Sequence, residues 1–415
     1  MRFCKRCLYP EIHPLNLTLN EEGVCSGCLV HDEKDQLDWR ERADRLGKLL
    51  NAYRSKSRNG YDCIVPVSGA RDSYFIVHVI KYVYKMHPLL VSYNKQYNTA
   101  LGIRNLAYLR TLMDCDFVSS TVNPNAVKRI TRATLQKLGS MYWHCLAGET
   151  VFPVQVAVRY KIPLIVWGVH QGCDQVGMFS HLDEVEMTRK YRKEHDLMGT
   201  EAEDLVGYED LTERDLAPYF YPHDEELSSV GVRGIYLSNY IRWDSKAQHE
   251  EMIRRYGYKT AAQQRTFDVY NDVDSFHYSG IHDYLKVLKH GFGKVTDHAC
   301  REIRLKRLTR QEGAQKVLQY SDRSPTDLSL FLNWIGMDKE TFDALVEPYR
   351  NPLFWRKNEN EKWERVHTTP PIPYDDGNEE VTCEGPGSFH FMHRPLHNSF
   401  DSMDDYVLIG KGYEP

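Results

Sequence analysis

The chain has 415 residues, with 53 Lys or Arg against 58 Asp or Glu, so its formal net charge at pH 7 is −5. A sequence pI near 6.4 gives it no global basic field of the kind that binds nucleic acid or anionic membranes. Its longest apolar runs, such as residues 162–168, are far shorter than the roughly 20 residues of a membrane-spanning helix. The opening MRFCKRC has no apolar segment behind it and predicts no signal peptide. We therefore expect a cytoplasmic globular protein of two or three domains, with no nucleic-acid partner and no membrane span.

Two CxxC pairs stand near the N-terminus, Cys4 with Cys7 and Cys25 with Cys28, and 17 residues separate them. This spacing is typical of a four-cysteine zinc knuckle, in which two tight turns bring four thiolates around one ion. A closed four-sulfur site has no open position, so we expect structural Zn²⁺, with iron as the rival ion. The alternatives are two unrelated thiol pairs or a redox CxxC, but no strand–helix unit precedes these cysteines. A charged, helix-prone stretch follows, and residues 1–57 are expected to form the knuckle and a linker helix.

From residue 58 to residue 236 the chain alternates between short apolar segments and helical stretches. We expect strands at residues 62–67, 88–93, 117–122 and 163–168, and helices at residues 73–85, 100–113, 124–138 and 149–160. This alternation predicts an α/β domain with a parallel sheet covered on both faces. Ligands of such folds bind at the carboxyl ends of the strands. The sequence places Ser92, Tyr93 and Gly168 at two of these ends, and a polar loop at a third.

That loop lies in the stretch VPVSGARDSYF, where a β-branched run leads into a turn and then an apolar helix. The GxxxxGK[ST] spacing of a Walker A motif is absent. Backbone N–H groups of such a turn can still hold an anion, the serine hydroxyls can donate to phosphate, and the aspartate suits Mg²⁺. The alternative is a plain connection in which Asp and Ser cap the helix. The candidate nucleotide-binding residues are Ser68, Gly69, Ala70, Arg71, Asp72 and Ser73.

The loop SGARDS resembles the SGGxDS signature of the pyrophosphatase-loop (PP-loop) ATPases, which cleave ATP to AMP and pyrophosphate. Ala70 replaces the second glycine of that signature. If this position needs a positive φ, alanine costs on the order of 1–2 kcal/mol, and its methyl group crowds a phosphate. If φ is negative there, alanine costs little. Arg71 can add a positive charge near the phosphates.

Residues 237–356 are charged and predominantly helical in pattern, and we expect them to complete the site. The candidate ligand contacts in this block are His282, Lys286, Lys289, Lys294, His298, Arg301 and Arg304. Of these, Lys289 and Arg301 are predicted to be catalytic together with Asp72 and Ser73. The alternative is that they form solvated helix faces with charge pairs. The two glycines of KHGFGK would each weaken a helix by roughly 1 kcal/mol, so this stretch predicts a loop over a ligand.

Residues 357–415 have the composition of a linker and a surface tail. The segment HFMHRPLHNSF brings three histidines close together in sequence, but no acidic or cysteine partner stands beside them to complete a metal site. No role is predicted for this tail.

Four blocks of the chain, in order, resemble the N-acetyl sugar amidotransferases of bacterial surface-polysaccharide (lipopolysaccharide O-antigen) and nonulosonic-acid biosynthesis. The blocks are the CKRC and CSGC pairs, SGARDS, HDYLKVLKHGFGKVTDHACREIR and FLNWIGMDKETF. The resemblance covers roughly residues 1–356. It implies that ATP and Mg²⁺ are used to convert an acetamido group of an N-acetylated sugar, free or nucleotide-linked, to an acetamidino group through an adenylated imidate. It also implies a separate glutaminase subunit that supplies ammonia.

Besides Ala70, one further departure and two alternatives accompany this resemblance. The chain has Val169 and His170 after a Trp-Gly pair where the family usually carries an acidic residue, which leaves the sugar open. One alternative is another PP-loop ATPase that thiolates tRNA or a small molecule, although the acidic pI argues against tRNA. The other is a non-catalytic scaffold in which Ala70 marks a degenerate loop.

Overall fold

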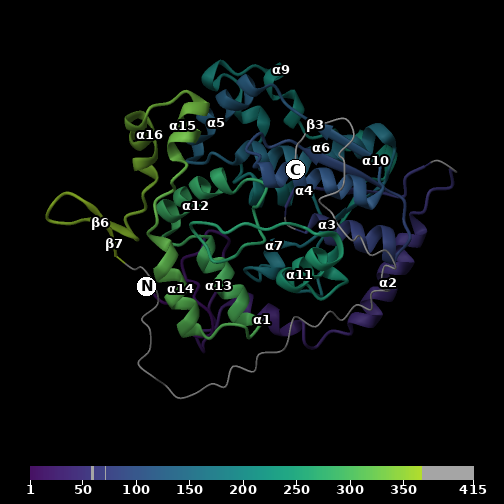
Figure 1. Cartoon of the computed structure of the whole chain (residues 1–415), viewed down its shortest axis with the longest axis horizontal. Coiled ribbons are helices and arrows are strands. Elements are labelled where there is room, and N and C mark those ends of the chain that lie inside the picture. The colour runs from purple at the N-terminus through teal and green to yellow at the C-terminus, as the bar shows by residue number, and fades with distance from the viewer. Residues whose placement is uncertain (58–59, 71, 367–415) are drawn as a thin grey trace.

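Five short strands form one parallel sheet at the centre of the molecule (Figure 1). The computed structural model describes residues 1–57, 60–70 and 72–366. The strands are β1 (Cys63–Pro66), β2 (Pro88–Tyr93), β3 (Phe117–Ser120), β4 (Leu164–Trp167) and β5 (Arg233–Tyr236). Their order across the sheet is β3-β2-β1-β4-β5. The chain builds outward from β1 to β3 and then returns to the other side of β1, so the winding reverses between β1 and β4.

The expected α/β fold with a parallel sheet is confirmed. β2 has the predicted bounds, and the other three expected strands lie within their predicted ranges. β5 was not predicted, because its four residues RGIY carry neither an apolar run nor an alternating pattern. It pairs in parallel with β4, with Leu164 opposite Arg233, and forms one edge of the sheet.

Helices cover both faces of the sheet because successive side chains of each strand point to opposite sides. On one face lie α2 (Trp39–Ala52), α3 (Ser73–Val77), α4 (Ala100–Met113) and α11 (Ser245–Tyr256). Their side chains form an apolar cluster with Val65, Leu90 and Val166 of the strands. On the other face, α5 (Pro124–Leu138) and α6 (Trp143–Tyr160) pack against Ile64 and Val91.

Two of the four expected helices differ from their predicted bounds. α4 and α5 have the predicted bounds, whereas α6 begins at Trp143 instead of Glu149. Most residues in the first turns of α6 are buried, so no polar face marks this part of the helix in the sequence. The helix expected at residues 73–85 is α3 followed by a π-helical turn at His78–Val83.

Short helices connect β4 to β5, and several of them pack on the outside of α6. They include α7 (Gln171–Asp174), α8 (Arg189–Tyr191), α9 (Glu213–Leu216) and α10 (Asp224–Val230), with single turns of 3-10 helix between them. Leu197, Leu205 and Tyr219 from this connection are fully buried in the cluster of the α6 face. The connection therefore belongs to the core of the fold.

The C-terminal region contributes to two separate cores. Its elements are α12 (Phe276–His290), α13 (Lys294–Arg304), α14 (Arg310–Ser321), α15 (Leu328–Ile335), α16 (Lys339–Val346) and the hairpin β6 (Trp355–Lys357) and β7 (Trp363–Arg365). α13 and α14 pack with the N-terminal cysteine segment and its helix α1 (Ser26–Glu33) (Figure 1). α12, α15 and α16 pack together with the turn between α5 and α6.

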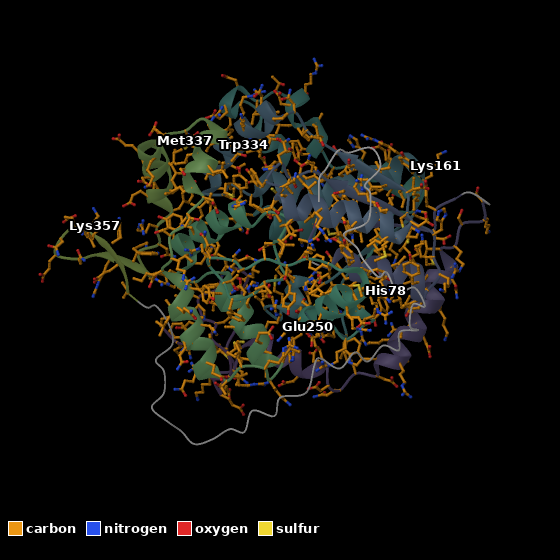
Figure 2. The ribbon with its side chains drawn as sticks, viewed as in Figure 1. His78, Lys161, Glu250, Trp334, Met337 and Lys357 are labelled. Atoms are coloured by element: carbon orange, nitrogen blue, oxygen red, sulfur yellow. The ribbon has the colours of Figure 1, made fainter. Side chains whose placement is uncertain are left out.

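The hairpin lies at the predicted boundary between residues 356 and 357. Lys357 on this hairpin lies at the outer edge of the molecule, whereas His78 lies beside the sheet (Figure 2). The rest of the expected tail, with His390, His393 and His397, falls outside the described residues. Within the described ranges, no helix is both long enough and apolar enough to cross a bilayer.

The KHGFGK stretch forms the turn between α12 and α13, where we expected a loop over a ligand. Gly291 has φ +71° and ends α12, which is the usual place for a glycine. A Cβ atom on Gly291 would lie 2.6 Å from Cγ of Phe354, and one on Gly293 would lie 2.7 Å from a carboxylate oxygen of Asp283. Close packing against Phe354 and against α12 therefore explains both glycines.

Candidate functional site

The turn after β1 is held closed by its own serine hydroxyls. The backbone N–H of Ser68 donates to Ser73 Oγ at 2.9 Å, and this hydroxyl donates to the carbonyl oxygen of Ala70 at 3.0 Å. Ser68 Oγ accepts from the N–H of Ala70 at 3.3 Å. Both serines proposed as phosphate ligands therefore shape the turn, and Arg71 lies outside the described residues.

Gly69 allows this turn to pack directly on two other backbone segments. A Cβ atom on Gly69 would lie 2.7 Å from the carbonyl carbon of Gly102 in the first turn of α4. A Cβ atom on Gly102 would in turn lie 2.7 Å from Cβ of Asp274. Thr99 holds the same contact by donating its hydroxyl to the carbonyl of Val273 at 2.5 Å and its N–H to that of Asp274 at 2.8 Å. The turn, α4 and the segment before α12 thus form a stack of backbones.

Ala70 fits this turn without strain. It is not among the residues of the described chain that adopt a positive φ, so the left-handed penalty considered from the sequence does not apply. Its side chain is 1% exposed and belongs to the apolar cluster under α3. The methyl group is part of the core.

Lys95, which follows β2, is the centre of a buried charge cluster beside this stack. Its ammonium lies 3.0 Å from a carboxylate oxygen of Glu149 in α6 and 2.9 Å from one of Asp274. The same ammonium lies 5.9 Å from the centroid of the Tyr142 ring. The hydroxyl of Tyr142 is 3.1 Å from Ser275 Oγ. Two carboxylates around one lysine make this a strongly charged place at the carboxyl edge of the sheet.

The three residues predicted at the other strand ends have different roles. Ser92 is buried and lies on the side of β2 that faces α4. Tyr93 points to the opposite face, where its hydroxyl bonds to that of Tyr219 at 2.7 Å, and burial raises its pKa well above the usual value. A Cβ atom on Gly168 would lie 2.9 Å from Ile76, so this glycine allows the end of β4 to approach α3. Tyr93 is therefore a core residue.

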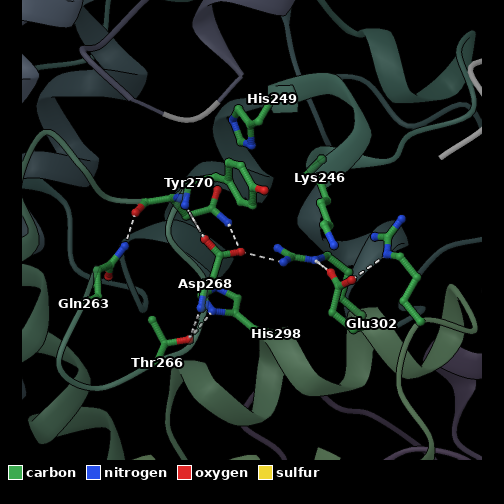
Figure 3. A network of polar contacts seen from close by, with 12 residues as sticks. Lys246, His249, Gln263, Thr266, Asp268, Tyr270, His298 and Glu302 are labelled. Atoms are coloured by element: carbon green, nitrogen blue, oxygen red, sulfur yellow. Dashed lines mark hydrogen bonds and ion pairs between the residues drawn. The ribbon is translucent and has the colours of Figure 1, made fainter. Parts of the chain in front are cut away.

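A second polar network surrounds Asp268, in the irregular segment 257–275 between α11 and α12 (Figure 3). The carboxylate accepts from Arg301 of α13 at 2.5 Å, and from the N–H groups of Tyr270 and Asn271 at 2.9 Å each. Burial alone would raise the pKa of Asp268, but the positive charges of His298 and Arg301 outweigh it and hold the pKa well below its usual range. Asp268 is therefore ionised throughout the physiological range.

His249 connects this network to the turn after β1. Its ring is stacked between Tyr258, at 5.6 Å between centroids, and Tyr270, at 5.5 Å. Its Nε2 lies 3.8 Å from Oδ1 of Asp72. Figure 3 shows His249 over the ring of Tyr270, next to the Asp268 network. Asp72 at the end of the loop thus faces the segment that carries Asp268.

The predicted catalytic residues of the C-terminal region separate in the structure. Arg301 lies in the Asp268 network and also bonds to Glu302 at 2.8 Å. Lys289 donates to the carbonyl oxygen of Leu138 at 3.1 Å, and burial lowers its pKa to about 8. A cation bonded to the last carbonyls of a helix stabilises that helix end, so Lys289 supports α5 rather than facing the loop.

The other candidates of this block also have partners within the protein. Lys294 bonds to Gln263 at 2.9 Å and to Ser279 at 3.1 Å. Lys286 pairs with Asp297 at 2.5 Å. The ring of His282 stacks on Tyr142 at 4.9 Å, and Arg304 points at the cysteines.

The four N-terminal cysteines form one buried cluster, as predicted. Their sulfur atoms all lie within 4.8 Å of one another, and none of the four forms a disulfide. Cys7 and Cys25 are 3.5 Å apart at their sulfurs, and Cys4 and Cys28 are 4.0 Å apart. Four sulfurs bound to one Zn²⁺ at about 2.3 Å lie about 3.8 Å apart in a tetrahedron, so the donor set and its size fit this ion.

Sequence analysis missed Lys95, Glu149, His249, Asp268 and Asp274. Lys95 stands two residues after a correctly predicted strand, so its position at the sheet edge was available as a signal. The two aspartates lie in the acidic stretch DVYNDVD, which carries no spacing that marks a site. His249 is one polar residue of an amphipathic helix, and only packing brings it to Asp72.

Comparison with known proteins gives a matching family and distantly similar solved structures. Residues 250–369 match the family described as LPS biosynthesis protein WbpG-like, C-terminal domain. The chain is similar to an NH3-dependent NAD synthetase from Campylobacter jejuni subsp. jejuni NCTC 11168, solved in complex with the nitrate ion. Identity is 10% with a TM-score of 0.27, over 47% of this chain and 92% of that chain. A TM-score of this size does not establish a common fold, and no curated protein matches the chain.

Residues that match this family lie beside the loop after β1. Residues 250–369 include Asp268, Arg301 and the segment 257–275, which contact the loop after β1 through His249. The part of the chain that is similar to an LPS biosynthesis domain therefore forms one wall of the candidate site.

Proposed function

We propose that the protein is an ATP-dependent, AMP- and pyrophosphate-forming amidotransferase that acts on an N-acetylated sugar in lipopolysaccharide biosynthesis. The observation that carries the proposal is the contact between Asp72 and His249 at 3.8 Å. It brings a strand–turn–helix loop, at the point where the sheet reverses its winding, to His249. The ring of His249 stacks on Tyr258 and Tyr270 of the segment similar to an LPS biosynthesis domain. Open α/β sheets bind ligands at this reversal point.

The loop is proposed to bind the phosphates of ATP. Free backbone N–H groups of the turn are proposed to donate to phosphate oxygens, and the Asp72 carboxylate is proposed to hold Mg²⁺. The hydroxyls of Ser68 and Ser73 keep the turn closed by bonding to the carbonyl oxygen of Ala70. Bound Mg²⁺ neutralises charge on the departing pyrophosphate. Gly69 keeps the turn tight enough to present its donors, because its lack of a side chain lets the turn sit on α4.

The reaction itself solves the problem that an amide oxygen is a poor leaving group. The acetamido oxygen of the sugar attacks the α-phosphorus of ATP, and the bond to pyrophosphate breaks. Ammonia then adds to the imidate carbon, loses a proton, and expels AMP with the former amide oxygen, which leaves an acetamidino group. Lys95 beside Asp274 and Arg301 in the Asp268 network are proposed to stabilise negative charge at this edge.

Ammonia is proposed to come from a separate glutaminase subunit, and Zn²⁺ in the four-cysteine centre is proposed to be structural. Cys63 and Cys145, which lie outside that centre, are buried, and burial raises the pKa of Cys145 well above its usual value. A thiol held in its neutral form is a poor nucleophile. These buried cysteines are therefore poor candidates for hydrolysing glutamine.

The test measures AMP and pyrophosphate release from the full chain with ATP, Mg²⁺, ammonium and a panel of N-acetylated sugars, free and UDP-linked. We expect AMP formation that depends on one sugar and is abolished in Asp72→Asn. The matched control is Asp114→Asn, since the side chain of Asp114 is fully exposed next to the amino end of β3 and should not matter. Retained sugar-dependent AMP release in Asp72→Asn would contradict the assigned role of the loop. Absence of ATP binding, measured by calorimetry, would favour a scaffold.

A further inference from the structure

The side chain of Arg304, in the last turn of α13, is buried against the four-cysteine centre. Its guanidinium donates to the sulfur of Cys28 at 3.5 Å, to that of Cys25 at 3.5 Å and to that of Cys7 at 3.9 Å. The remaining N–H groups donate to the backbone carbonyl of Gln175 at 2.6 Å. Arg304 is 6% exposed, so nearly all of its hydrogen-bonding capacity is directed at this centre and the segment after β4.

The knuckle is shaped to admit this side chain. A Cβ atom on Gly27, between Cys25 and Cys28, would lie 2.9 Å from the guanidinium carbon of Arg304 and 2.7 Å from the carbonyl oxygen of Gln175. Ser26 also donates to the carbonyl of Val176 at 2.7 Å. Glycine at this position therefore leaves the space through which Arg304 reaches the sulfurs.

Other residues on the same side of α13 contact the same knuckle. Asp297 accepts from the hydroxyl of Tyr9 at 2.9 Å, and Cys300 Sγ accepts from the N–H of Leu8 at 3.4 Å. Positions 297, 300 and 304 recur at the three- and four-residue spacing of one helix face. Tyr9 also lies under Arg304, with 5.4 Å from the guanidinium carbon to the ring centroid.

The adjacent face of α13 carries the Asp268 network. Arg301 contacts Asp268 at 2.5 Å, and His298 Nδ1 is 2.6 Å from the hydroxyl of Thr266. Figure 3 shows His298 and Glu302 directed from this helix toward the segment of Asp268. One helix of eleven residues therefore joins the cysteine centre to the wall of the candidate site.

We propose that Arg304 is a positioning residue that binds the thiolates of the metal-loaded cysteine centre and thereby holds α13 with Arg301 against Asp268. Four thiolates around one divalent ion carry a net double negative charge in a buried place, which a buried cation offsets. Neighbours that donate hydrogen bonds to metal ligands orient those ligands and tune the affinity for the metal. The inference rests on a metal at the four cysteines and is independent of the amidotransferase reaction.

The first experiment measures zinc affinity of the full chain by competition with a chromogenic chelator, together with the sulfur-to-cobalt absorption band of the Co²⁺-substituted protein. We expect Arg304→Met to weaken zinc binding about tenfold to a hundredfold and to shift the cobalt band. We expect Arg304→Lys, which keeps the charge but not the fork of donors, to lie between Arg304→Met and the wild type.

Arg310 provides a matched control, because it contacts the same knuckle without touching a sulfur. Its Nε donates to the carbonyl oxygen of Cys7 at 3.1 Å and to that of Cys4 at 3.4 Å. We expect Arg310→Met to leave zinc affinity and the cobalt band at wild-type values. Wild-type affinity in Arg304→Met, or an equal loss in Arg310→Met, would overturn the proposal.

A second experiment uses the wild-type chain and so does not depend on how a variant folds. Hydrogen exchange is followed in α13 and in α4 before and after zinc is removed with a chelator. We expect exchange in residues 294–304 to rise about tenfold or more while residues 100–113 keep their protection, since local opening is confined to the unit that loses its support. Unchanged protection in α13, or an equal rise in α4, would contradict the link.

Discussion

The cysteine centre and the Asp268 network lie on adjacent faces of α13, yet the two are built on different principles. All four ligands of the centre come from the first 28 residues and contribute a single atom type, sulfur. The network draws its members from the loop after β1, α11, α13 and an irregular segment, and it balances several charges of both signs. The first depends on one bound ion, whereas the stability of the second is distributed over many pairs.

The two regions therefore respond differently to the loss of one component. A centre held by one ion is lost as a whole when a ligand or the ion is removed. A network of buried pairs loses the contribution of one pair at a time, although each loss leaves a charge without its partner. We therefore expect losses in the free energy of unfolding that differ in size between the two regions.

The largest effect is expected at the cysteine centre. Cys25→Ser should lower the free energy of unfolding by about 4 kcal/mol in the presence of zinc at a thousand times its Kd, because the bound ion no longer stabilises the folded state. Urea unfolding of the zinc-loaded chain measures this. Cys115→Ser is the control, since this half-buried thiol donates to the carbonyl of Met113 at 3.3 Å and a hydroxyl can replace it. Equal losses in the two variants would argue against a metal centre.

The next effect is expected in the network. Asp268→Asn leaves Arg301 buried with one carboxylate fewer, which should lower the free energy of unfolding by about 3 kcal/mol. Adding Arg301→Gln to this variant should recover part of that loss, because the uncompensated charge is then gone. A double-mutant cycle by urea unfolding measures the coupling, and strictly additive losses would show that the pair is not coupled.

Mild acid should separate the two regions. The ring of His13 stacks on Phe292 near the cysteine segment. Burial and the charge of Lys286 lower the pKa of His13 to about 3. The unfolded chain protonates this histidine near pH 6.5, so the unfolded state binds more protons and stability falls as pH falls. The contribution of His13 to this loss between pH 6.5 and 5 is about 2 kcal/mol.

His13→Phe should flatten this dependence by that amount, as measured by urea unfolding at several pH values. Asp268 contributes nothing to it, because a carboxylate with a depressed pKa loses its stabilisation only as pH falls below about 4. Asp114→Asn is the matched control, because the side chain of Asp114 is fully exposed, and its slope between pH 6.5 and 5 should equal that of the wild type. A slope in His13→Phe as steep as in the wild type would contradict the assignment.

The smallest effect is expected in the loop. Ala70→Gly removes a buried methyl group and adds backbone freedom to the unfolded chain, so it should lower the free energy of unfolding by about 1 kcal/mol. It should leave ATP affinity, measured by calorimetry, within twofold of the wild type. Gly69→Ala places a methyl group against Gly102 and should be far more destabilising. A large gain of ATP affinity in Ala70→Gly would restore the view of a degenerate loop.

The parts of the fold that could be predicted are those with a local signal. β2, α4 and α5 have their predicted bounds because each carries a run or a period of apolar residues. The cysteine cluster could be predicted because the spacing of the pairs is itself the constraint. β5 and the first turns of α6 could not, since their burial comes from neighbours distant in sequence.

The candidate site was predicted less completely, and for the same reason. The loop after β1 was found from its residues, but its glycine and alanine could be interpreted only once the backbones of Gly102 and Asp274 were known. Lys289, Arg301 and Arg304 look alike in the sequence as cations on helices. In the structure they contact a helix end, a carboxylate and a sulfur cluster, respectively, because their side chains leave the helices in different directions.

The stack of Gly69, Gly102 and Asp274 also has a mechanical consequence. Side chains absorb small displacements by changing rotamer, but backbone atoms in direct contact have no such freedom. The loop, the start of α4 and the segment before α12 must therefore shift as one rigid body. Any ligand that moves Asp274 is therefore expected to move the loop through main-chain contact.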